Sequence, residues 1–325
     1  MPKDRKHWID SMRGMCMLAI LLDHTEIYYT GTNIIDYNMY VTDALYLFFF
    51  ISGYLLYREN GEMDLRKRAV GILRTLVMPY FIFTTAMALP KAIAHNNNLN
   101  LGNTAMDIIT GQASWFIAAL LIAEFLFMTT AKVCKGNAWL MACVGGIATG
   151  GAIMLSTTDC GHFWQTDIAL LAMPMLTLGF VYHKYEDSWR TDTRTAILAA
   201  IAVIATKVYV ANTDTILMIR PINISNYDLF AINVVTGCWA MTCIFKRIPK
   251  CKPLEWIGRH TIVYYFLCGG VPLTISSLSN RMGFAYDGNY IKVVIVYATV
   301  CAVATLLTFA IYKYVPFVTG RQKQP

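Results

Sequence analysis

Ten long apolar segments occupy most of this 325-residue chain, and they leave few folds open to it. A hydrocarbon core about 30 Å thick requires roughly 20 apolar residues for each helical crossing. Hydrophobic residues make up 56% of the chain and charged residues only 14%, whereas soluble domains carry about 25% charged residues. The sequence therefore predicts an all-α fold, a polytopic membrane bundle of about ten transmembrane helices in a single domain over residues 1–325. We expect the spans at residues 14–30, 40–57, 70–92, 113–131, 138–155, 165–183, 195–211, 229–245, 261–278 and 290–312.

The positions of lysine and arginine indicate how these helices are oriented. With the N-terminus on the inside, 22 of the 27 basic residues fall on the inner side. Only Lys91, Arg220, Arg281 and Lys292 fall in outer loops, and Lys207 lies within the seventh span. Because cytoplasmic loops carry an excess of Lys and Arg, we expect both termini in the cytoplasm and a multi-pass protein of a bacterial inner (plasma) membrane. A basic inner face near anionic lipid headgroups also accounts for the net charge of +7 without a nucleic-acid partner.

Glycine and cysteine patterns bear on packing rather than on chemistry. Gly146 and Gly150 in the fifth span are four residues apart, a spacing that predicts close contact with a neighbouring helix. The nine cysteines are scattered singly, without the paired spacing of a zinc site. We therefore expect neither a metal centre nor a disulfide framework.

Ionisable side chains inside the membrane mark candidate functional positions, because one charge at the bilayer centre costs roughly 2.5–3.5 kcal/mol. Asp23, His24 and Glu26 fall near the outer end of the first span, Glu124 in the fourth and Lys207 in the seventh. Glu124 either orients a catalytic group or pairs with Lys207, and the sequence does not distinguish these alternatives. For Lys207 itself, an internal ion pair or a snorkelling side chain is the structural interpretation.

Two further aspartates stand at predicted helix starts. Asp43 opens the second span and Asp167 opens the sixth. Short carboxylate side chains often cap helix N-termini and interact favourably with the helix dipole there. An interfacial cap is therefore the favoured interpretation of both, and a buried functional charge is the alternative.

The first span places an arginine and a histidine on one face of a helix. Arg13 and His24 are eleven residues apart, which brings them to within about 20° of each other, with an axial separation of about 16 Å. Asp10, Met17 and Leu21 continue the same stripe. We expect Arg13 at the inner end and His24 deep in the membrane to face one shared cavity. This layout suits a long anionic donor that is held at its inner end and reacts at its far end.

His24 is the leading candidate for acid–base catalysis, because an imidazole titrates near neutral pH. Asp23 or Glu26 could raise its basicity, although Asp23 lies about 100° away around the helix. A packing role is the structural alternative for an isolated intramembrane histidine. The Arg13 partner and the adjacent acids favour the functional interpretation.

Six motifs in order along the chain resemble those of acyltransferase family 3 of integral membrane proteins, in particular its fucose-O-acetylase-like branch. The most specific are Arg13 and His24 with ten residues between them, and the aromatic run before Ser52 and Gly53. One departure is Cys268, near the place where many relatives carry a second histidine. The matching segments are Ile9-Asp10-Ser11-Met12-Arg13-Gly14 with His24, Phe48-Phe49-Phe50-Ile51-Ser52-Gly53-Tyr54-Leu55, Arg66-Lys67-Arg68 with Arg74-Thr75-Leu76-Val77-Met78-Pro79-Tyr80, Trp115-Phe116-Ile117, Asp167 with Pro174 and Gly179, and Ile257-Gly258-Arg259-His260-Thr261-Ile262-Val263-Tyr264-Tyr265.

The resemblance implies transfer of an acyl group, usually acetyl, from cytoplasmic acyl-CoA to a hydroxyl of a cell-surface polysaccharide or a lipid-linked sugar. The donor expected on this basis is acetyl-CoA. His24 would act as general base on the acceptor hydroxyl or would carry the acyl group briefly. Asp23 and Glu124 would be the supporting catalytic residues.

The resemblance also implies how the donor is bound. Arg13, Arg68 and Arg74 would hold the phosphates of coenzyme A by charge-assisted hydrogen bonds. Ser52 and Trp115 would shape the tunnel for the acyl arm. The structural alternatives are positive-inside anchoring for Arg68 and Arg74, and packing for Ser52 and Trp115.

Two other classes of function remain as alternatives. A transporter or flippase of polysaccharide precursors would also have many helices and intramembrane charges, but it should show internal repeats or paired broken helices, and the sequence has neither. A non-catalytic membrane partner in a biosynthetic complex would not explain an arginine and a histidine facing one cavity. The sequence does not identify the acceptor sugar, the acyl group or the oligomeric state, and a homodimer is possible.

Overall fold

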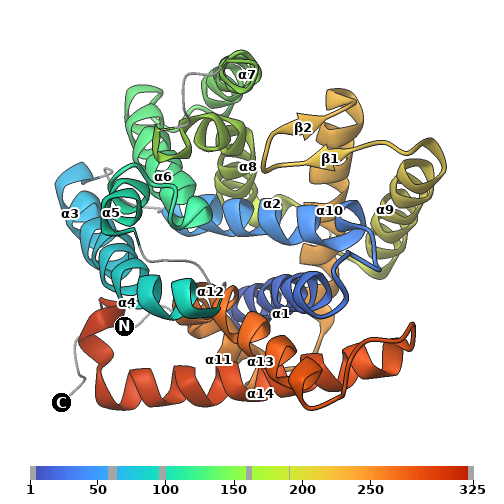
Figure 1. The fold of residues 1–325 in the computed structure, drawn as a ribbon. Coiled ribbons are helices and arrows are strands. Elements are labelled where there is room, and N and C mark those ends of the chain that lie inside the picture. The colour runs from blue at the N-terminus through green and yellow to red at the C-terminus, as the bar shows by residue number, and fades with distance from the viewer. Residues whose placement is uncertain (1–4, 58–63, 95–99, 159–162, 190, 321–325) are drawn as a thin grey trace.

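The computed structural model describes residues 5–57, 64–94, 100–158, 163–189 and 191–320, and these residues are almost entirely helical (Figure 1). A π-helical segment, Leu73–Val77, joins α3 to α4, and a short 3-10 turn, Phe163–Gln165, leads into α8. The helices are α1 (His7–Thr30), α2 (Tyr37–Leu56), α3 (Leu65–Ile72), α4 (Met78–Ala94), α5 (Leu101–Ile109), α6 (Trp115–Val133), α7 (Ala138–Ser156), α8 (Thr166–Lys184), α9 (Thr193–Thr213), α10 (Tyr227–Arg247), α11 (Lys252–Arg259), α12 (Thr261–Leu267), α13 (Gly270–Arg281) and α14 (Tyr290–Tyr314).

Eight of the described helical segments are long and apolar enough to cross a membrane, and the pair α12–α13, bent by 44°, makes a ninth. The remaining long helix is α1, whose 24 residues would span about 36 Å. It is too polar to qualify as a span by composition. Each of the ten predicted spans overlaps one of these segments, and the polytopic helical bundle is confirmed.

The polar helix α1 lies inside the bundle, which explains how its charges are tolerated. It packs against α2, α10, α11, α12, α13 and α14. The carboxylates of Asp10, Asp23 and Glu26 on this helix are all buried. By contrast, α7 and α9 lie at the edge of the bundle in Figure 1, and only 17% of each is buried. Polar groups are thus gathered inside the protein, and the apolar surfaces of the outer helices are left for lipid.

Two pairs of motif glycines let helices meet backbone to backbone. A Cβ on Gly258 of α11 would lie 1.7 Å from the carbonyl oxygen of Asp10, and one on Gly14 of α1 would lie 2.2 Å from a backbone oxygen of α11. At the crossing of α2 and α8, a Cβ on Gly53 or on Gly179 would lie 1.9 Å from a backbone oxygen of the other helix. No side chain fits at these contacts, so the glycines of four motifs have a packing role.

The packing contact predicted from Gly146 and Gly150 is wrong. Neither residue has an atom within 4 Å of the position that a Cβ would take. The packed glycine of α7 is their neighbour Gly145, where a Cβ would lie 3.3 Å from Pro174 of α8. The four-residue spacing identifies a helix face without side chains, but it does not show which face of the helix packs against another helix.

The internal ion pair predicted for Lys207 is confirmed, and its partner is Asp43. The two side chains, from α9 and α2, are 2.6 Å apart, and the Asn233 amide of α10 donates to the same carboxylate at 3.0 Å. The interpretation of Asp43 as a helix cap is therefore wrong. The cap of α2 is Asp36, because the helix begins earlier than its apolar run. Asp167 is not the cap of α8 either, because the N-cap position is Gln165, but it lies in the first turn of that helix and is buried there.

A cluster around Glu186 joins four segments at the end of the bundle where α1 begins, which we call the inner end after the orientation expected from the sequence. The carboxylate lies 2.5 Å from Lys6 Nζ and 2.7 Å from Lys246 Nζ, and it accepts a hydrogen bond from Tyr54. Burial alone would raise the pKa of Glu186, but the hydrogen bonds from Lys246, Lys6 and Tyr54 outweigh it and hold the pKa at about 2. The cluster therefore fastens the start of α1 to the ends of α2, α8 and α10.

A small antiparallel hairpin lies between α9 and α10 at the opposite end of the bundle. Its strands are β1 (Leu217–Met218) and β2 (Asn223–Ile224). The Leu217 amide donates to the Asn38 side chain at 2.9 Å, and Thr42 Oγ1 donates to the Leu217 carbonyl at 3.0 Å. The hairpin is thus fastened to α2, and Arg220 lies in the connection between its two strands.

Candidate functional site

Two cavities lie on the same side of α1, one nearer each end of the helix. The outer cavity, of about 1020 Å³, is lined by His24 and Asp23 of α1. The inner cavity, of about 280 Å³, is lined by Arg13 of the same helix. Tyr265 of α12 lines both. The expectation of one shared cavity is thus modified, because Tyr265 divides the space between Arg13 and His24.

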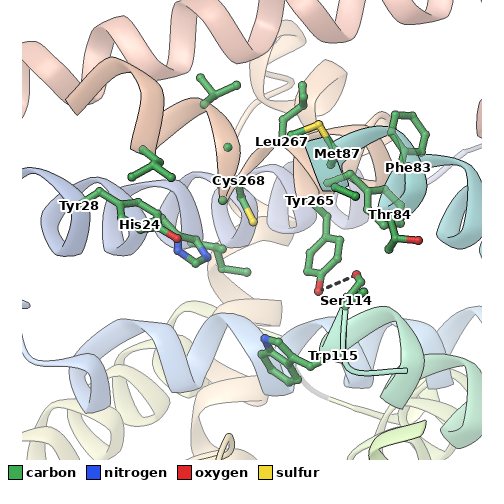
Figure 2. A pocket seen from close by; sticks show the side chains of 18 of the residues that line it. His24, Tyr28, Phe83, Thr84, Met87, Ser114, Trp115, Tyr265, Leu267 and Cys268 are labelled. Carbon is green, nitrogen blue, oxygen red and sulfur yellow. Dashed lines mark hydrogen bonds between the residues drawn. The ribbon is translucent and has the colours of Figure 1, made fainter. Parts of the chain in front are cut away.

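The outer cavity contains His24 together with aromatic side chains (Figure 2). The imidazole is stacked against the ring of Tyr28 one turn further along α1, with centroids 6.0 Å apart and planes inclined by 14°. Trp115, from the start of α6, projects into the same cavity from the opposite wall. Cys268, near the place of the second histidine in many relatives, also lines this cavity.

The nitrogens of His24 are not occupied by any partner among the described residues. Among the described residues no hydrogen bond or ion pair reaches the imidazole, and its neighbour Asp23 instead accepts a hydrogen bond from Asn33 at 2.5 Å. Glu26 accepts from the Ile34 amide at 3.1 Å and from the Tyr290 hydroxyl at 2.7 Å. The two acids thus hold the connection between α1 and α2, and neither pairs with the imidazole.

The inner cavity contains a ring of charged and polar side chains. Arg13 donates to Thr261 Oγ1 at 2.8 Å, which joins α1 to α12. Ser52 of α2 donates to the Glu124 carboxylate of α6 at 2.6 Å, so Glu124 pairs with Ser52 and not with Lys207. The basic groups that act electrostatically on Glu124 are Arg68 and Arg13. Two of the predicted donor-binding residues, Arg13 and Ser52, therefore line this cavity, whereas Trp115 lines the outer one.

The three predicted phosphate-binding arginines have different surroundings. Arg13 lines the inner cavity. Arg68 does not line it, and donates to the Leu56 carbonyl at 3.2 Å. Arg74 is exposed and lines neither cavity. Arg259, which the sequence reasoning did not single out, lines the inner cavity beside Arg13. Its signal was its place within the last motif, next to the packing glycine Gly258.

Tyr265 forms the wall between the cavities. Its hydroxyl accepts hydrogen bonds from Ser114 Oγ and from the Phe116 amide, each at 3.2 Å, and its ring lies 5.6 Å from that of Phe116. Figure 2 shows the ring reaching from α12 to the start of α6. The bend between α12 and α13 follows only a few residues later. The Tyr265 side chain therefore stands between the inner and the outer cavity.

Arg220 lines the outer cavity, and it is another residue that the sequence did not single out. Its guanidinium carbon lies 5.5 Å from the centre of the Trp115 ring, and its Nε donates to Gln165 at 3.1 Å. The signal for it was its position, because it is one of the few basic residues assigned to an outer loop. Its distance in sequence from the other motifs concealed that it reaches the same cavity.

The arrangement is suited to a reaction between two ligands that enter from opposite sides. Basic groups around the inner cavity can hold an anionic donor. The imidazole in the outer cavity can accept a proton from a hydroxyl and return it to a leaving group. Among the described residues no group of three or more histidine, cysteine, aspartate or glutamate side chains could hold a metal ion.

Comparison with known proteins agrees with the resemblance in the sequence. The family of an acyltransferase domain matches residues 6–313, which is nearly the whole chain. In the same comparison, no curated protein and no solved structure matches this chain. The match includes every residue that lines the outer cavity and, apart from Thr319, every residue that lines the inner cavity. The chain therefore belongs to this acyltransferase family, acyltransferase family 3, and is a multi-pass membrane acyltransferase.

Proposed function

We propose that this acyltransferase transfers an acetyl group from acetyl-CoA on the inner side of a bacterial inner membrane to a hydroxyl of a cell-surface polysaccharide or lipid-linked sugar on the outer side. One observation carries the proposal: Arg13 and His24 lie on one face of α1 but line an inner and an outer cavity. A donor and an acceptor could thus approach the same point from opposite sides.

The inner cavity is the proposed donor site. Arg13 and Arg259 line it, and guanidinium groups bind phosphate by paired, charge-assisted hydrogen bonds. A volume of about 280 Å³ is much smaller than coenzyme A. We therefore place only the extended arm and its thioester in this cavity, with the phosphates at its inner mouth, held by Arg13 and Arg259. Ser52 and Glu124 form the wall along which the arm would lie.

His24 is the proposed acid–base group. Its imidazole accepts the proton of the acceptor hydroxyl while the hydroxyl oxygen attacks the thioester carbonyl carbon. The carbon–sulfur bond breaks, and the departing thiolate takes the proton from the imidazolium, which leaves an ester and free coenzyme A. In the alternative order, His24 first accepts the acetyl group from the thioester and then passes it to the hydroxyl. In both orders the imidazole, which has no hydrogen-bond partner among the described residues, can use its nitrogens to bind substrate.

Tyr265 would determine when the two ligands meet. The thioester must pass this side chain to reach His24, since Tyr265 lines both cavities. Rotation of the ring would break the hydrogen bonds from Ser114 and Phe116, and that cost keeps the partition closed when no donor is bound. A closed partition also protects the thioester from water on the outer side.

The proposal is tested by comparing surface glycans from cells with the intact gene, without it, and with the gene restored. We expect O-acetyl groups on one glycan to be lost on deletion and to return on restoration, and membranes with the protein to transfer label from radioactive acetyl-CoA to that glycan. Identical acetylation in all three strains would contradict the proposed acceptor class. Transfer of label from another acyl-CoA but not from acetyl-CoA would contradict the proposed donor.

A further inference from the structure

Arg220 is held rigidly at the outer cavity. It lies in the β1–β2 connection of a hairpin whose residues Leu217 and Ile219 are fully buried. The Gln165 side chain accepts from its Nε at 3.1 Å, and this amide in turn donates to Gln112 at 2.8 Å. These contacts fix one edge of the guanidinium, because they use the Nε–H only. Among the residues that the structure describes, no hydrogen bond uses the two terminal nitrogens, which leaves this fork for a ligand in the cavity that Arg220 lines.

The charge of Arg220 is incompletely compensated by the protein. In the part of the chain that the structure describes, no carboxylate forms an ion pair with Arg220. Its guanidinium group instead lies over the face of the Trp115 ring. Burial lowers the pKa of Arg220, and the electrostatic influence of Tyr265, Asp167 and Tyr37 opposes this only in part. A partly buried cation in such a place gains most from an anionic ligand, because binding replaces the lost hydration.

The position of Arg220 identifies which substrate would supply the anion. The phosphates of the donor belong at the inner mouth, on the far side of Tyr265, and Arg220 lines only the outer cavity. That cavity also contains the imidazole of His24, so a ligand at Arg220 shares the cavity with the reacting hydroxyl. Rings of Trp115, Tyr37 and Tyr28 supply apolar faces on which the carbons of a sugar could pack.

We propose that the fork of Arg220 binds a carboxylate or phosphate group of the acceptor, and that the enzyme therefore acts on an anionic glycan. This inference rests on the proposed function and specifies the class of acceptor. The other ionisable groups of the cavity set the orientation. Asp23 is held by Asn33 near His24, and Asp107 lines the cavity from α5, so an anion is repelled from these positions and directed to Arg220.

The inference is tested with glycan isolated from cells that carry the His24→Ala variant, which supplies unacetylated acceptor. Membranes with wild-type protein, Arg220→Gln, Arg220→Lys or Arg281→Gln are given labelled acetyl-CoA and increasing amounts of this glycan. Arg281 is the matched control, because it is an exposed arginine at the end of α13 and lines neither cavity. Binding of acetyl-CoA to each purified variant is measured in parallel.

We expect Arg220→Gln to raise the KM for glycan by about 10- to 100-fold, because the variant loses a pair of charge-assisted hydrogen bonds to the acceptor. Binding of acetyl-CoA should be unchanged. Arg220→Lys should be intermediate, since it keeps the charge without the fork. Arg281→Gln should equal wild type. An unchanged KM in Arg220→Gln would overturn the inference while leaving the proposed function intact. Absence of glycan acetylation in wild-type cells would instead contradict the proposed function itself.

The chemical position of the acetyl group distinguishes the possible sources of the anion. Mass spectrometry and NMR of the acetylated product should place the acetyl group on a sugar that bears a carboxylate or phosphate, or on its direct neighbour. Labelled product in the polymer fraction with a sugar acid at that position would identify a carboxylate. Product in the lipid fraction would identify the phosphate of a lipid-linked sugar. Acetylation within a neutral stretch of glycan would overturn the inference.

Discussion

Arg13 and His24 project from one face of α1 into two different cavities, and Tyr265 is the side chain that both cavities share. By the helical rise, the two residues are about 16 Å apart along the axis of α1. One helix could therefore fix the distance between the place where the donor is held and the place where it reacts.

Arg13→Ala and Arg259→Ala should each weaken acetyl-CoA binding by about 10- to 100-fold, because each removes a cation from the inner cavity. Equilibrium binding of labelled acetyl-CoA to purified protein measures this. Arg74→Ala is the control on the same side of the bundle, since Arg74 is exposed and lines neither cavity. Equal affinity in all three variants would show that the phosphates bind elsewhere.

Tyr265→Ala should open the partition between the cavities. We expect more hydrolysis of acetyl-CoA in the absence of glycan, because water from the outer cavity would reach the thioester. Tyr265→Phe keeps the ring but loses the hydrogen bonds from Ser114 and Phe116, so its hydrolysis rate should lie between those of wild type and Tyr265→Ala. Release of free thiol measures hydrolysis. A rate in Tyr265→Ala equal to that of wild type would mean that Tyr265 is not a barrier.

Gly258→Ala should destabilise the protein by at least about 1–3 kcal/mol, because the added methyl group would lie 1.7 Å from the Asp10 carbonyl oxygen. Thermal unfolding in detergent and the amount of protein in membranes measure the effect. Gly146→Ala is the matched control, since the same change there meets no atom within 4 Å. Equal stability of the two variants would contradict the close crossing of α1 and α11.

Glu186 should contribute stability that depends on pH. Its pKa is about 2 in the folded protein against an ordinary value of 4.5, so its contribution is complete above pH 4.5 and is lost as the pH falls toward 2. Thermal unfolding of wild type and Glu186→Gln as a function of pH measures this. The two proteins should differ at neutral pH and converge in acid. A difference that grows as the pH falls would contradict the assignment.

The sequence predicted the arrangement best where the information was local. Apolar runs located all ten helical segments, and helical periodicity placed Arg13 and His24 on one face. Cap and packing assignments were less successful, because they depend on neighbours that are distant along the chain. Asp43 was interpreted as a cap, but its ion-pair partner Lys207 is 164 residues away. Similarly, the spacing of glycines in α7 could not show which face meets α8.

The sequence predicted Arg13 and His24, which line the two separate cavities, but it did not predict Tyr265 between them. The spaced arginine and histidine are a local pattern on one helix, whereas the wall at Tyr265 exists only because α12 approaches the start of α6. Arg220 reaches the cavity because its hairpin is hydrogen-bonded to α2. The periodicity of the sequence does not predict this contact between distant segments. The signal for Arg220 in the sequence was its place in an expected outer loop, because most basic residues of this chain fall on the inner side.

The most direct test of the account is glycan acetylation by the His24→Gln variant, measured together with its binding of acetyl-CoA. Glutamine can fill the space and donate a hydrogen bond, but it cannot accept a proton at neutral pH. A positioned acid–base group contributes roughly 100- to 10,000-fold, so we predict almost complete loss of acetylation with unchanged acetyl-CoA binding. Normal acetylation by this variant would remove His24 from the chemistry and contradict the account.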